Sequence, residues 1–345
     1  MVRIASDTPA MARGTRSTSD HGARPELIDL DLLFVTGKGG VGKTTLAAAI
    51  AEVAAREGRR VLVCEMDAKG ALATAFEVAE LSFDPTEIDD GLWAMTMSTE
   101  DSLREYLRLY VRIPLIGRIS ALASTFDFVA DAAPGVKEIL AIGKICFEVR
   151  ERNYDLVVVD AEASGHVVSQ IGAPRVIADL VQVGLVRDQT EWMLDILDDP
   201  ARTGVAVVTT PEEMPVTESI ELLDRLLDET GAHPVAVLAN RTLPAMFTRR
   251  EQPLARRLDD AVPALVDLAG PGAAAVVDAA SIIEARRSVG AGHLDRLRTA
   301  LDDRTDPPLN GLPIVSVPEM FGRSHGRRVV SRVADALADE IVVEP

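Results

Sequence analysis

A glycine-rich octapeptide, residues 37–44, constrains this chain more than any other feature of its sequence. It reads Gly-Lys-Gly-Gly-Val-Gly-Lys-Thr and fits the phosphate-binding pattern G-x-x-x-x-G-K-[ST]. The apolar run 32–35 before it is typical of a parallel strand buried on both faces, and the periodicity of 43–56 after it predicts a helix. Strand, glycine turn and helix in this order bring backbone N–H groups and a helix N-terminus to a phosphate. We therefore expect a nucleotide-binding site here.

The residues of this loop have distinct expected roles. Lys43 should reach the β- and γ-phosphates, and the Thr44 hydroxyl should bind Mg²⁺. Lys38 is a second lysine inside the loop; it is either a solvated cation or a group that reaches phosphate across a dimer interface, as an arginine finger does. The expected nucleotide-binding residues of the loop are Gly37, Lys38, Gly39, Gly40, Val41, Gly42, Lys43, Thr44 and Thr45.

Short apolar or β-branched runs recur along the rest of the chain and alternate with helical stretches. Besides 32–35, these runs predict strands at 60–64, 156–159, 205–209, 235–238 and 313–317. This alternation favours the α/β class, with a doubly wound, mainly parallel sheet of the P-loop NTPase kind. Three intervals are longer than a crossover needs, so we expect helical insertions at about 84–152, 167–200 and 247–304.

The chain has no internal repeat and no sharp linker, so we expect one domain at 30–345. Residues 1–29 are rich in Ser, Thr, Arg, Gly and Pro without periodicity, which predicts a disordered arm. This arm has no apolar segment typical of a signal peptide, and no apolar run is long enough to span a membrane, so we expect a cytoplasmic protein. The formal net charge of −18 opposes binding to nucleic acid.

A carboxylate follows the third of these runs. Asp160 ends the stretch 154–160, and a strand that ends in aspartate is the Walker B arrangement, which places a carboxylate at the Mg²⁺ hydration shell. With the phosphate loop present in the same chain, Thr44 and Asp160 are the expected metal residues.

Residues 37–45 resemble the deviant Walker A motif of the dimerising ATPases. This group includes arsenical-pump ATPases, tail-anchored-protein targeting ATPases, partition proteins and septum-site proteins. The resemblance implies a dimer that binds ATP and Mg²⁺, in which Lys38 contacts the partner's nucleotide. It makes Lys38, Lys43 and Asp67 the expected catalytic residues.

Two further segments resemble the switches of the arsenical-pump and targeting ATPases. Residues 65–76 are similar to the first switch, in which Asp67 would orient and deprotonate the attacking water. An aspartate that caps the next helix is the other interpretation of Asp67. Residues 161–166 are similar to the second switch, where Gly165 and His166 match and Ala163 replaces a proline. His166 is either a link between phosphate and conformation or an ordinary residue at a helix start.

The resemblance also suggests which residues contact the base. Asn240 matches an asparagine that reads the adenine edge, although asparagine also commonly ends a strand in a turn. The residues after Asn240 lack the aspartate of guanine readers, which favours ATP over GTP. Pro318 lies in 317–321, which resembles the loop that packs against the base.

Members of this group differ in function through their helical insertions, and the sequence argues against several of these functions. Arsenite pumps use clustered cysteines, whereas this chain has only Cys64 and Cys146 and no Cys-x-x-Cys pair for zinc. A methionine-rich client groove has little support, because Met95, Met97 and Met193 are the methionines near the first two insertions. The stripe Leu103, Tyr106, Leu107 and Tyr110 is typical of core packing, and the amphipathic segment 327–341 is expected to pack onto the sheet rather than bind a membrane.

The sequence thus predicts a Mg²⁺-dependent, ATP-hydrolysing dimeric switch, most similar to bacterial arsenical-pump-like anion-transporter ATPases. Its ATP cycle would control a protein client or a membrane partner that the sequence does not name. The dimer could be a homodimer or a heterodimer with a related ATPase. The alternative is a nucleotide-binding regulatory subunit with little hydrolysis of its own, paired with a related active subunit.

Overall fold

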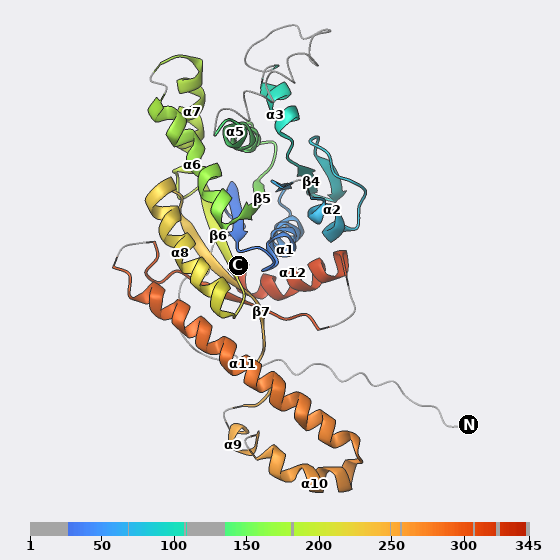
Figure 1. The fold of residues 1–345 in the computed structure, drawn as a ribbon. Coiled ribbons are helices and arrows are strands. Elements are labelled where there is room, and N and C mark those ends of the chain that lie inside the picture. The colour runs from blue at the N-terminus through green and yellow to red at the C-terminus, as the bar shows by residue number, and fades with distance from the viewer. Residues whose placement is uncertain are drawn as a thin grey trace, which may run out of the picture.

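The computed structural model describes residues 27–67, 69–106, 108, 135–180, 183–248, 250–255, 257–305, 308–321 and 325–342. In these residues the chain forms an eight-stranded sheet with the strand order β3-β4-β2-β5-β1-β6-β7-β8 (Figure 1). The strands are β1 (Leu32–Gly37), β2 (Val61–Glu65), β3 (Thr86–Asp89), β4 (Leu92–Thr96), β5 (Leu156–Ala163), β6 (Thr203–Thr209), β7 (Pro234–Thr242) and β8 (Ile314–Pro318). Every pairing is parallel except that of β3 with β4.

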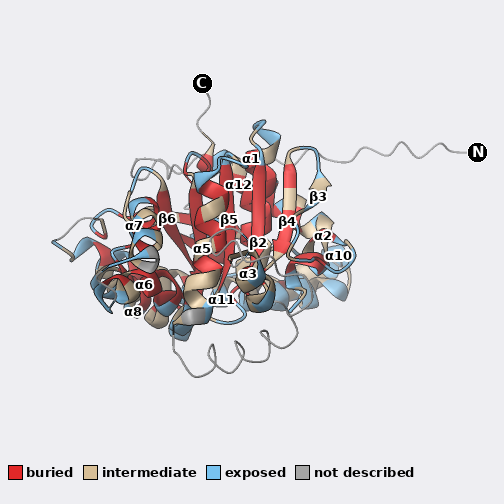
Figure 2. Cartoon of the chain, turned by 90° about the horizontal axis from the view of Figure 1, so that it is seen from above, coloured by how far each residue is buried: buried red, intermediate tan, exposed pale blue. Residues whose placement is uncertain are grey.

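Helices cover both faces of the sheet, which confirms the predicted doubly wound α/β architecture. The described helices are α1 (Lys43–Arg56), α2 (Ala71–Phe76), α3 (Thr99–Tyr106), α5 (Val136–Arg150), α6 (Ser164–Leu180), α7 (Leu185–Leu197), α8 (Glu213–Thr230), α9 (Gln252–Ala255), α10 (Leu258–Ala269), α11 (Gly272–Asp302) and α12 (Arg327–Ile341). Figure 2 shows the buried residues concentrated in the central strands. Successive side chains of a strand point to opposite faces of the sheet, so the buried residues form two cores. Leu33 and Val35 of β1 pack with α1 and α12 on one face, and Leu32 and Phe34 pack with α5, α6 and α8 on the other.

All six strands expected from the sequence are present, and α1 has the predicted bounds. The interval expected as a helical insertion at about 84–152 contains helices, but it begins with β3 and β4, which extend the sheet. The β3 residues Thr86, Glu87 and Asp89 are polar and exposed, so this antiparallel edge strand lacks the apolar run that identified the others. The expected helices do occur in the other two insertions, as α6 and α7 and as α9 to α11.

Two residues of the expected N-terminal arm belong to the fold. Leu27 and Ile28 are buried in the core that α1 and α12 form, so the boundary expected at residue 29 is too late. Residues 1–26 lie outside the described residues, as do Leu107 and Tyr110 of the predicted stripe. Its other members, Leu103 and Tyr106, are half-buried.

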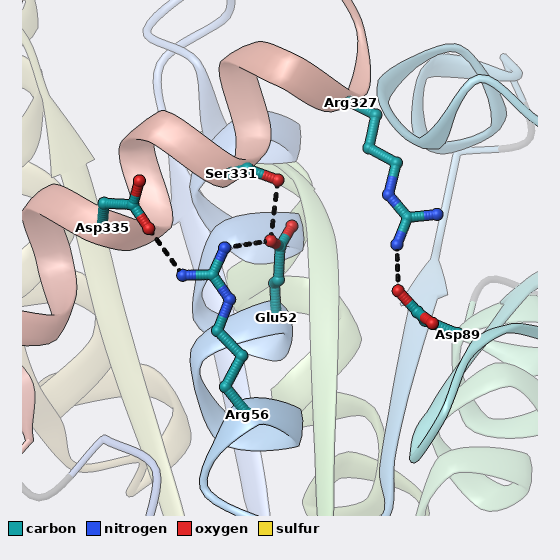
Figure 3. A network of polar contacts seen from close by, with 6 residues as sticks. All are labelled: Glu52, Arg56, Asp89, Arg327, Ser331 and Asp335. Atoms are coloured by element: carbon teal, nitrogen blue, oxygen red, sulfur yellow. Dashed lines mark hydrogen bonds and ion pairs between the residues drawn. The ribbon is translucent and has the colours of Figure 1, made fainter.

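The last helix, α12, packs against α1 and β8, which agrees with the expected packing of segment 327–341 onto the sheet. Val330, Val333 and Leu337 are buried, and polar contacts surround them (Figure 3). Arg56 donates to Asp335 over 2.7 Å, and the Ser331 hydroxyl donates to Glu52 over 2.8 Å. Arg327 pairs with Asp89 of β3, which ties α12 to the edge of the sheet. Among the described helices, none is both long and apolar enough to cross a membrane.

Candidate nucleotide-binding site

Two glycines of the loop between β1 and α1 have a backbone conformation and close neighbours that other residues would not tolerate. Gly37 has φ 147° and Gly42 has φ 96°, values that L side chains rarely adopt. A Cβ atom on Gly37 would collide with the carbonyl of Val208 on β6, and one on Gly42 would collide with the Asn240 amide. Gly39 and Gly40 face open space, so an incoming phosphate can approach the backbone there.

Lys43, the first residue of α1, lies along this loop. Its Nζ donates to the carbonyl of Lys38 over 3.3 Å. Burial lowers the pKa of Lys43, and the nearby carboxylate of Asp160 opposes this shift. Because an ammonium has three N–H donors, Lys43 keeps donors for a ligand after this contact.

Thr44 and Asp160 meet directly below the loop. The Thr44 hydroxyl donates to Asp160 Oδ2 over 2.6 Å, which joins the start of α1 to β5. Asp160 is buried, and burial raises its pKa to about 6, although the Thr44 hydrogen bond and the charge of Lys43 oppose the shift. A buried carboxylate beside a hydroxyl is a donor set that suits a hard cation such as Mg²⁺. Thr45, next on α1, is half-buried, and Val41 of the loop is buried in the core.

Asp67 lies in the segment after β2 and forms an ion pair with Lys69. The hydrogen bond from Lys69 to Asp67 raises the pKa of the lysine. Glu65, and not Asp67, caps the next helix: its carboxylate accepts from the backbone N–H groups of Ala71 over 2.9 Å and Leu72 over 3.4 Å. The alternative interpretation of Asp67 as a helix cap is therefore wrong.

The segment that resembles the second switch continues a strand. β5 extends past Asp160 to Ala163, with a bulge opposite β1, and α6 follows without a loop. The Glu162 carboxylate accepts from Gln170 of α6 over 2.9 Å, and its carbonyl accepts from the Thr36 hydroxyl over 3.0 Å. Gly165 and His166 form the first turn of α6, where the His166 side chain is 76% exposed. Gln170 therefore fixes the orientation of this segment.

Lys38 has a partner that the sequence analysis missed. Its Nζ forms an ion pair with Glu218 of α8, and both side chains are about a third exposed. The two residues are 180 positions apart in the chain, so no local pattern relates them.

Asn240 and Pro318 lie on the side of the loop opposite Asp160. Asn240 is buried, whereas Pro318 lines a cavity. Asn240 is inside β7 and buried, and its Nδ2 donates to the carbonyl of Val41 over 2.7 Å. Its Oδ1 accepts from the backbone N–H of Arg241 over 2.9 Å. The amide thus supports the phosphate loop. Pro318 ends β8 and lines a cavity of about 830 Å³ with the β7 end (241–244) and α11 residues near Gly290.

The structure brings the loop, Lys43, Thr44, Asp160 and Asp67 together at the carboxyl ends of β1, β2 and β5, where ligands of open α/β sheets bind. The cysteines lie on β2 and α5. Cys64 and Cys146 are fully buried, and burial raises the pKa of Cys146 to about 12. Within the described residues, no group of three or more His, Cys, Asp or Glu side chains could hold a metal ion. Met95, Met97 and Met193 are buried in the core.

Comparison with known proteins gives consistent matches. The family model described as Anion-transporting ATPase matches residues 30–189. ATPase BagA of Mycobacterium tuberculosis is 31% identical over 239 residues, which cover 66% of this chain and 69% of the relative. A Halobacterium salinarum protein named as an arsenical pump-driving ATPase is 27% identical over 256 residues, with 66% of this chain and 39% of the relative covered. ATPase ASNA1 homolog 1 of Paramecium tetraurelia is 27% identical over 150 residues, with 43% and 44% covered. The matched residues 30–189 include the phosphate loop, Asp67 and Asp160.

Proposed function

This chain belongs to the anion-transporting ATPase family and is an ATPase; from that premise we propose that it is a Mg²⁺-dependent, dimeric switch whose ATP cycle controls a protein partner. The observation that carries the proposal is the phosphate loop with two distinct lysines, Lys43 inside the site and Lys38 at its rim. Lys43 serves the nucleotide of its own chain. Lys38 is available to a second nucleotide once it leaves Glu218.

The metal would lie between the Thr44 hydroxyl and the Asp160 carboxylate. These groups fit Mg²⁺ because the carboxylate is buried close to the loop and its pKa is raised to about 6 by burial, so that a cation there would relieve an unfavourable charge. When bound, Mg²⁺ neutralises phosphate charge. The chain's own part is to hold the hydroxyl and the carboxylate 2.6 Å apart on two rigid elements, α1 and β5.

Asp67 would accept the proton of the attacking water as the new oxygen–phosphorus bond forms and the bond to the leaving ADP breaks. For this, Asp67 must exchange its partner Lys69 for the water. The ammonium of Lys69 would then face the triphosphate. Hydrolysis is thus coupled to a rearrangement of the segment after β2.

The base would occupy the cavity beside Pro318. Its volume of about 830 Å³ exceeds that of a nucleoside, and it adjoins Asn240, whose neighbour Arg241 lines it. Asn240 retains one N–H on Nδ2 after its bond to Val41, and this donor can contact the adenine edge.

The experiment that tests the proposal measures ATP turnover and molar mass by light scattering, with and without Mg²⁺-ATP. Lys43→Ala should lose ATP affinity, whereas Lys38→Ala should retain it and lose turnover and ATP-dependent dimerisation. Equal loss of affinity in the two variants would contradict the role of Lys38 across a dimer. ATP turnover that is unchanged without Mg²⁺ would contradict the proposed dependence on the metal.

A second candidate function is a regulatory subunit that binds ATP but hydrolyses it slowly and pairs with a related active subunit. The ion pair between Asp67 and Lys69 favours this second function, because Lys69 engages the carboxylate that would otherwise activate the water. Steady-state hydrolysis by the chain alone and with a related subunit separates the two functions. The same comparison distinguishes a homodimer from a heterodimer.

A trapped variant can identify the protein partner. Asp67→Asn keeps the shape of the side chain and removes its basicity, so this variant should retain ATP and the closed state. A pulldown with this variant should enrich one protein in ATP over ADP. Arsenite is a poor candidate effector, because both cysteines are buried and in separate elements.

A further inference from the structure

Glu162 carries a charge that the hydrolysis step described above does not use. It lies near the carboxyl end of β5, and its side chain is 29% exposed. β5 is between β1 and β2 in the sheet, so this end has the phosphate loop on one side and the segment of Asp67 on the other. Ligands of open α/β sheets bind at this edge. Glu162 is therefore placed to act on the reaction.

The pairing of β2 with β5 brings Glu162 close to the segment of Asp67. Glu65 pairs with Asp160 in parallel register, and the backbone N–H of Met66 donates to the carbonyl of Asp160 over 3.1 Å. The two chains thus stay together one residue beyond the end of β2. Asp67 and Glu162 each come two residues after the paired Glu65 and Asp160, so both carboxylates lie at the same end of the sheet.

Hydrogen bonds hold both the backbone and the side chain of Glu162. The Thr36 hydroxyl donates to its carbonyl over 3.0 Å, next to the start of the phosphate loop. Gln170 of α6 is 7% exposed, and its Nε2 donates to Glu162 Oε1 over 2.9 Å. The other oxygen, Oε2, is 3.7 Å from Nδ1 of His166, which is beyond hydrogen-bond distance. Oε2 therefore keeps lone pairs for a cation, in a fixed orientation.

Lys69 is a cation within electrostatic range of this acceptor. Its hydrogen bond to Asp67 is the main cause of its raised pKa, and the charges of Glu162 and Glu65 raise the pKa further. The Lys69 side chain is 75% exposed and has a flexible four-carbon stem, so its ammonium can move between neighbouring carboxylates. Glu65 is 2% exposed and already caps α2, which leaves Glu162 as the second acceptor for Lys69.

We propose that Glu162 is a positioning residue that takes Lys69 away from Asp67 when the triphosphate binds. The proposal rests on the role of Asp67 given under the proposed function. Lys69 moves from Asp67 to Glu162 Oε2, and the Asp67 carboxylate then accepts from the attacking water. An ammonium has three donors, so Lys69 can contact Glu162 and a phosphate oxygen together. The exchange transfers no proton and breaks no covalent bond.

The surroundings of the two carboxylates favour this exchange. The Asp67 side chain is 45% exposed, so its pair with Lys69 is weak and opens easily. Glu162 is already oriented by Gln170, and a group that is fixed in advance loses less conformational entropy when it binds. The Thr36 hydrogen bond keeps Glu162 beside the phosphate loop while the segment of Asp67 rearranges.

Glu162→Gln tests the proposal with little change of shape. Glutamine still accepts from Gln170 through its carbonyl, but its NH₂ group replaces the oxygen that would receive Lys69. The variant should lower kcat about fivefold, the upper range for one exposed ion pair, and leave the KM for ATP unchanged. Glu162→Asp keeps the charge and should recover part of the loss.

A matched control removes the same charge elsewhere. Glu229 pairs with Arg225 over 2.7 Å on the surface of α8, so Glu229→Gln should leave kcat and KM unchanged. Circular dichroism and ATP affinity check the fold of each variant. A Glu162→Gln variant that raises KM and leaves kcat unchanged would overturn the proposal, because Glu162 would then act on nucleotide binding.

A double-mutant cycle shows whether Glu162 acts through Lys69. In a chain that carries Lys69→Ala, the added Glu162→Gln substitution should change kcat less than about twofold, since no ammonium remains to be moved. An equal loss of kcat with and without Lys69 would overturn the proposal. Crystals grown with Mg²⁺, ADP and aluminium fluoride should show Lys69 Nζ on Glu162 Oε2, and Lys69 still on Asp67 would also overturn it.

The failure of this proposal differs from the failure of the proposed function. Near-normal hydrolysis by Asp67→Asn would refute Asp67 as the base, and the positioning role of Glu162 would be refuted with it. An inactive Asp67→Asn beside a Glu162→Gln variant with the kcat of the parent would refute only the role of Glu162.

Discussion

Asp160→Asn should stabilise the nucleotide-free protein while it disables the site. Asp160 is 6% exposed, and burial raises its pKa from 3.8 to about 6. A carboxyl with a raised pKa binds protons more tightly in the folded state than in the unfolded one, so its ionisation destabilises the fold as pH rises. The loss of folding free energy from this ionisation grows from about pH 4 and is complete above about pH 6. Asparagine has nearly the same shape and no charge, so it removes this cost and still accepts the Thr44 hydrogen bond.

The magnitude follows from the shift. About two pKa units correspond to roughly 3 kcal/mol at pH 8, and about half of that remains at pH 5, where the folded protein already holds the proton. Urea unfolding in EDTA should therefore show Asp160→Asn more stable than the parent, by more at pH 8 than at pH 5. Thr44→Ala should have the opposite effect at pH 8, because it removes the hydroxyl that stabilises the ionised carboxylate.

Added Mg²⁺-ATP should reverse the order of stability. The parent gains stability by binding the ligand, and the variant lacks the carboxylate that we assign to the metal. The reasoning would be refuted if Asp160→Asn were less stable than the parent at pH 8 without ligand, or if its advantage did not change with pH.

Four further predictions concern the charged groups around the phosphate loop. Lys43→Ala should lower ATP affinity at least about a hundredfold in calorimetry, because a charge-assisted contact to phosphate is lost and a buried site is left without its cation. Glu218→Gln should release Lys38 and increase ATP-dependent dimerisation in light scattering, with ATP affinity unchanged; an unaltered dimer population would argue against the pair as a restraint. Asp67→Asn should lower single-turnover hydrolysis about a hundredfold to ten-thousandfold with small loss of affinity, and Lys69→Ala should raise turnover if the ion pair with Asp67 limits it.

The sequence was sufficient for the parts of the fold that are buried on both faces. Strands such as β1 and β5 are continuous apolar runs because both of their faces contact helices, so their composition alone identifies them. β3 was missed because it is an edge strand whose side chains face water, and its register depends on β4 instead of on its own apolar pattern. Leu27 and Ile28 were missed for a related reason, since two apolar residues after a polar arm show no periodicity.

The site divides in the same way. The phosphate loop was predictable because its glycines, Lys43 and Thr44 all lie within eight consecutive residues, so their spacing in the sequence determines the geometry of the loop. The partners of these residues were not, because contacts such as that of Lys38 with Glu218 join elements that are adjacent only after the sheet has formed. Asn240 is a further example: the sequence shows the residue type, but it does not show the hydrogen bond from its amide to the carbonyl of Val41.

In the proposed cycle, the two ion pairs at the rim of the site would let a triphosphate act as a switch. Lys38 and Asp67, the two groups proposed to act on the γ-phosphate from outside the loop, each pair with an opposite charge of the same chain, Glu218 and Lys69. Both pairs are accessible to solvent, so they are weak; a pair like that of Lys38 and Glu218 contributes at most about 1 kcal/mol. A triphosphate attracts both lysines and repels both carboxylates, so its binding opposes the two pairs at once. Loss of the γ-phosphate removes charge from the side that faces them, and the pairs can form again. The free energy that distinguishes the two states then comes from the nucleotide, while the protein's own contribution stays small enough to reverse in every cycle.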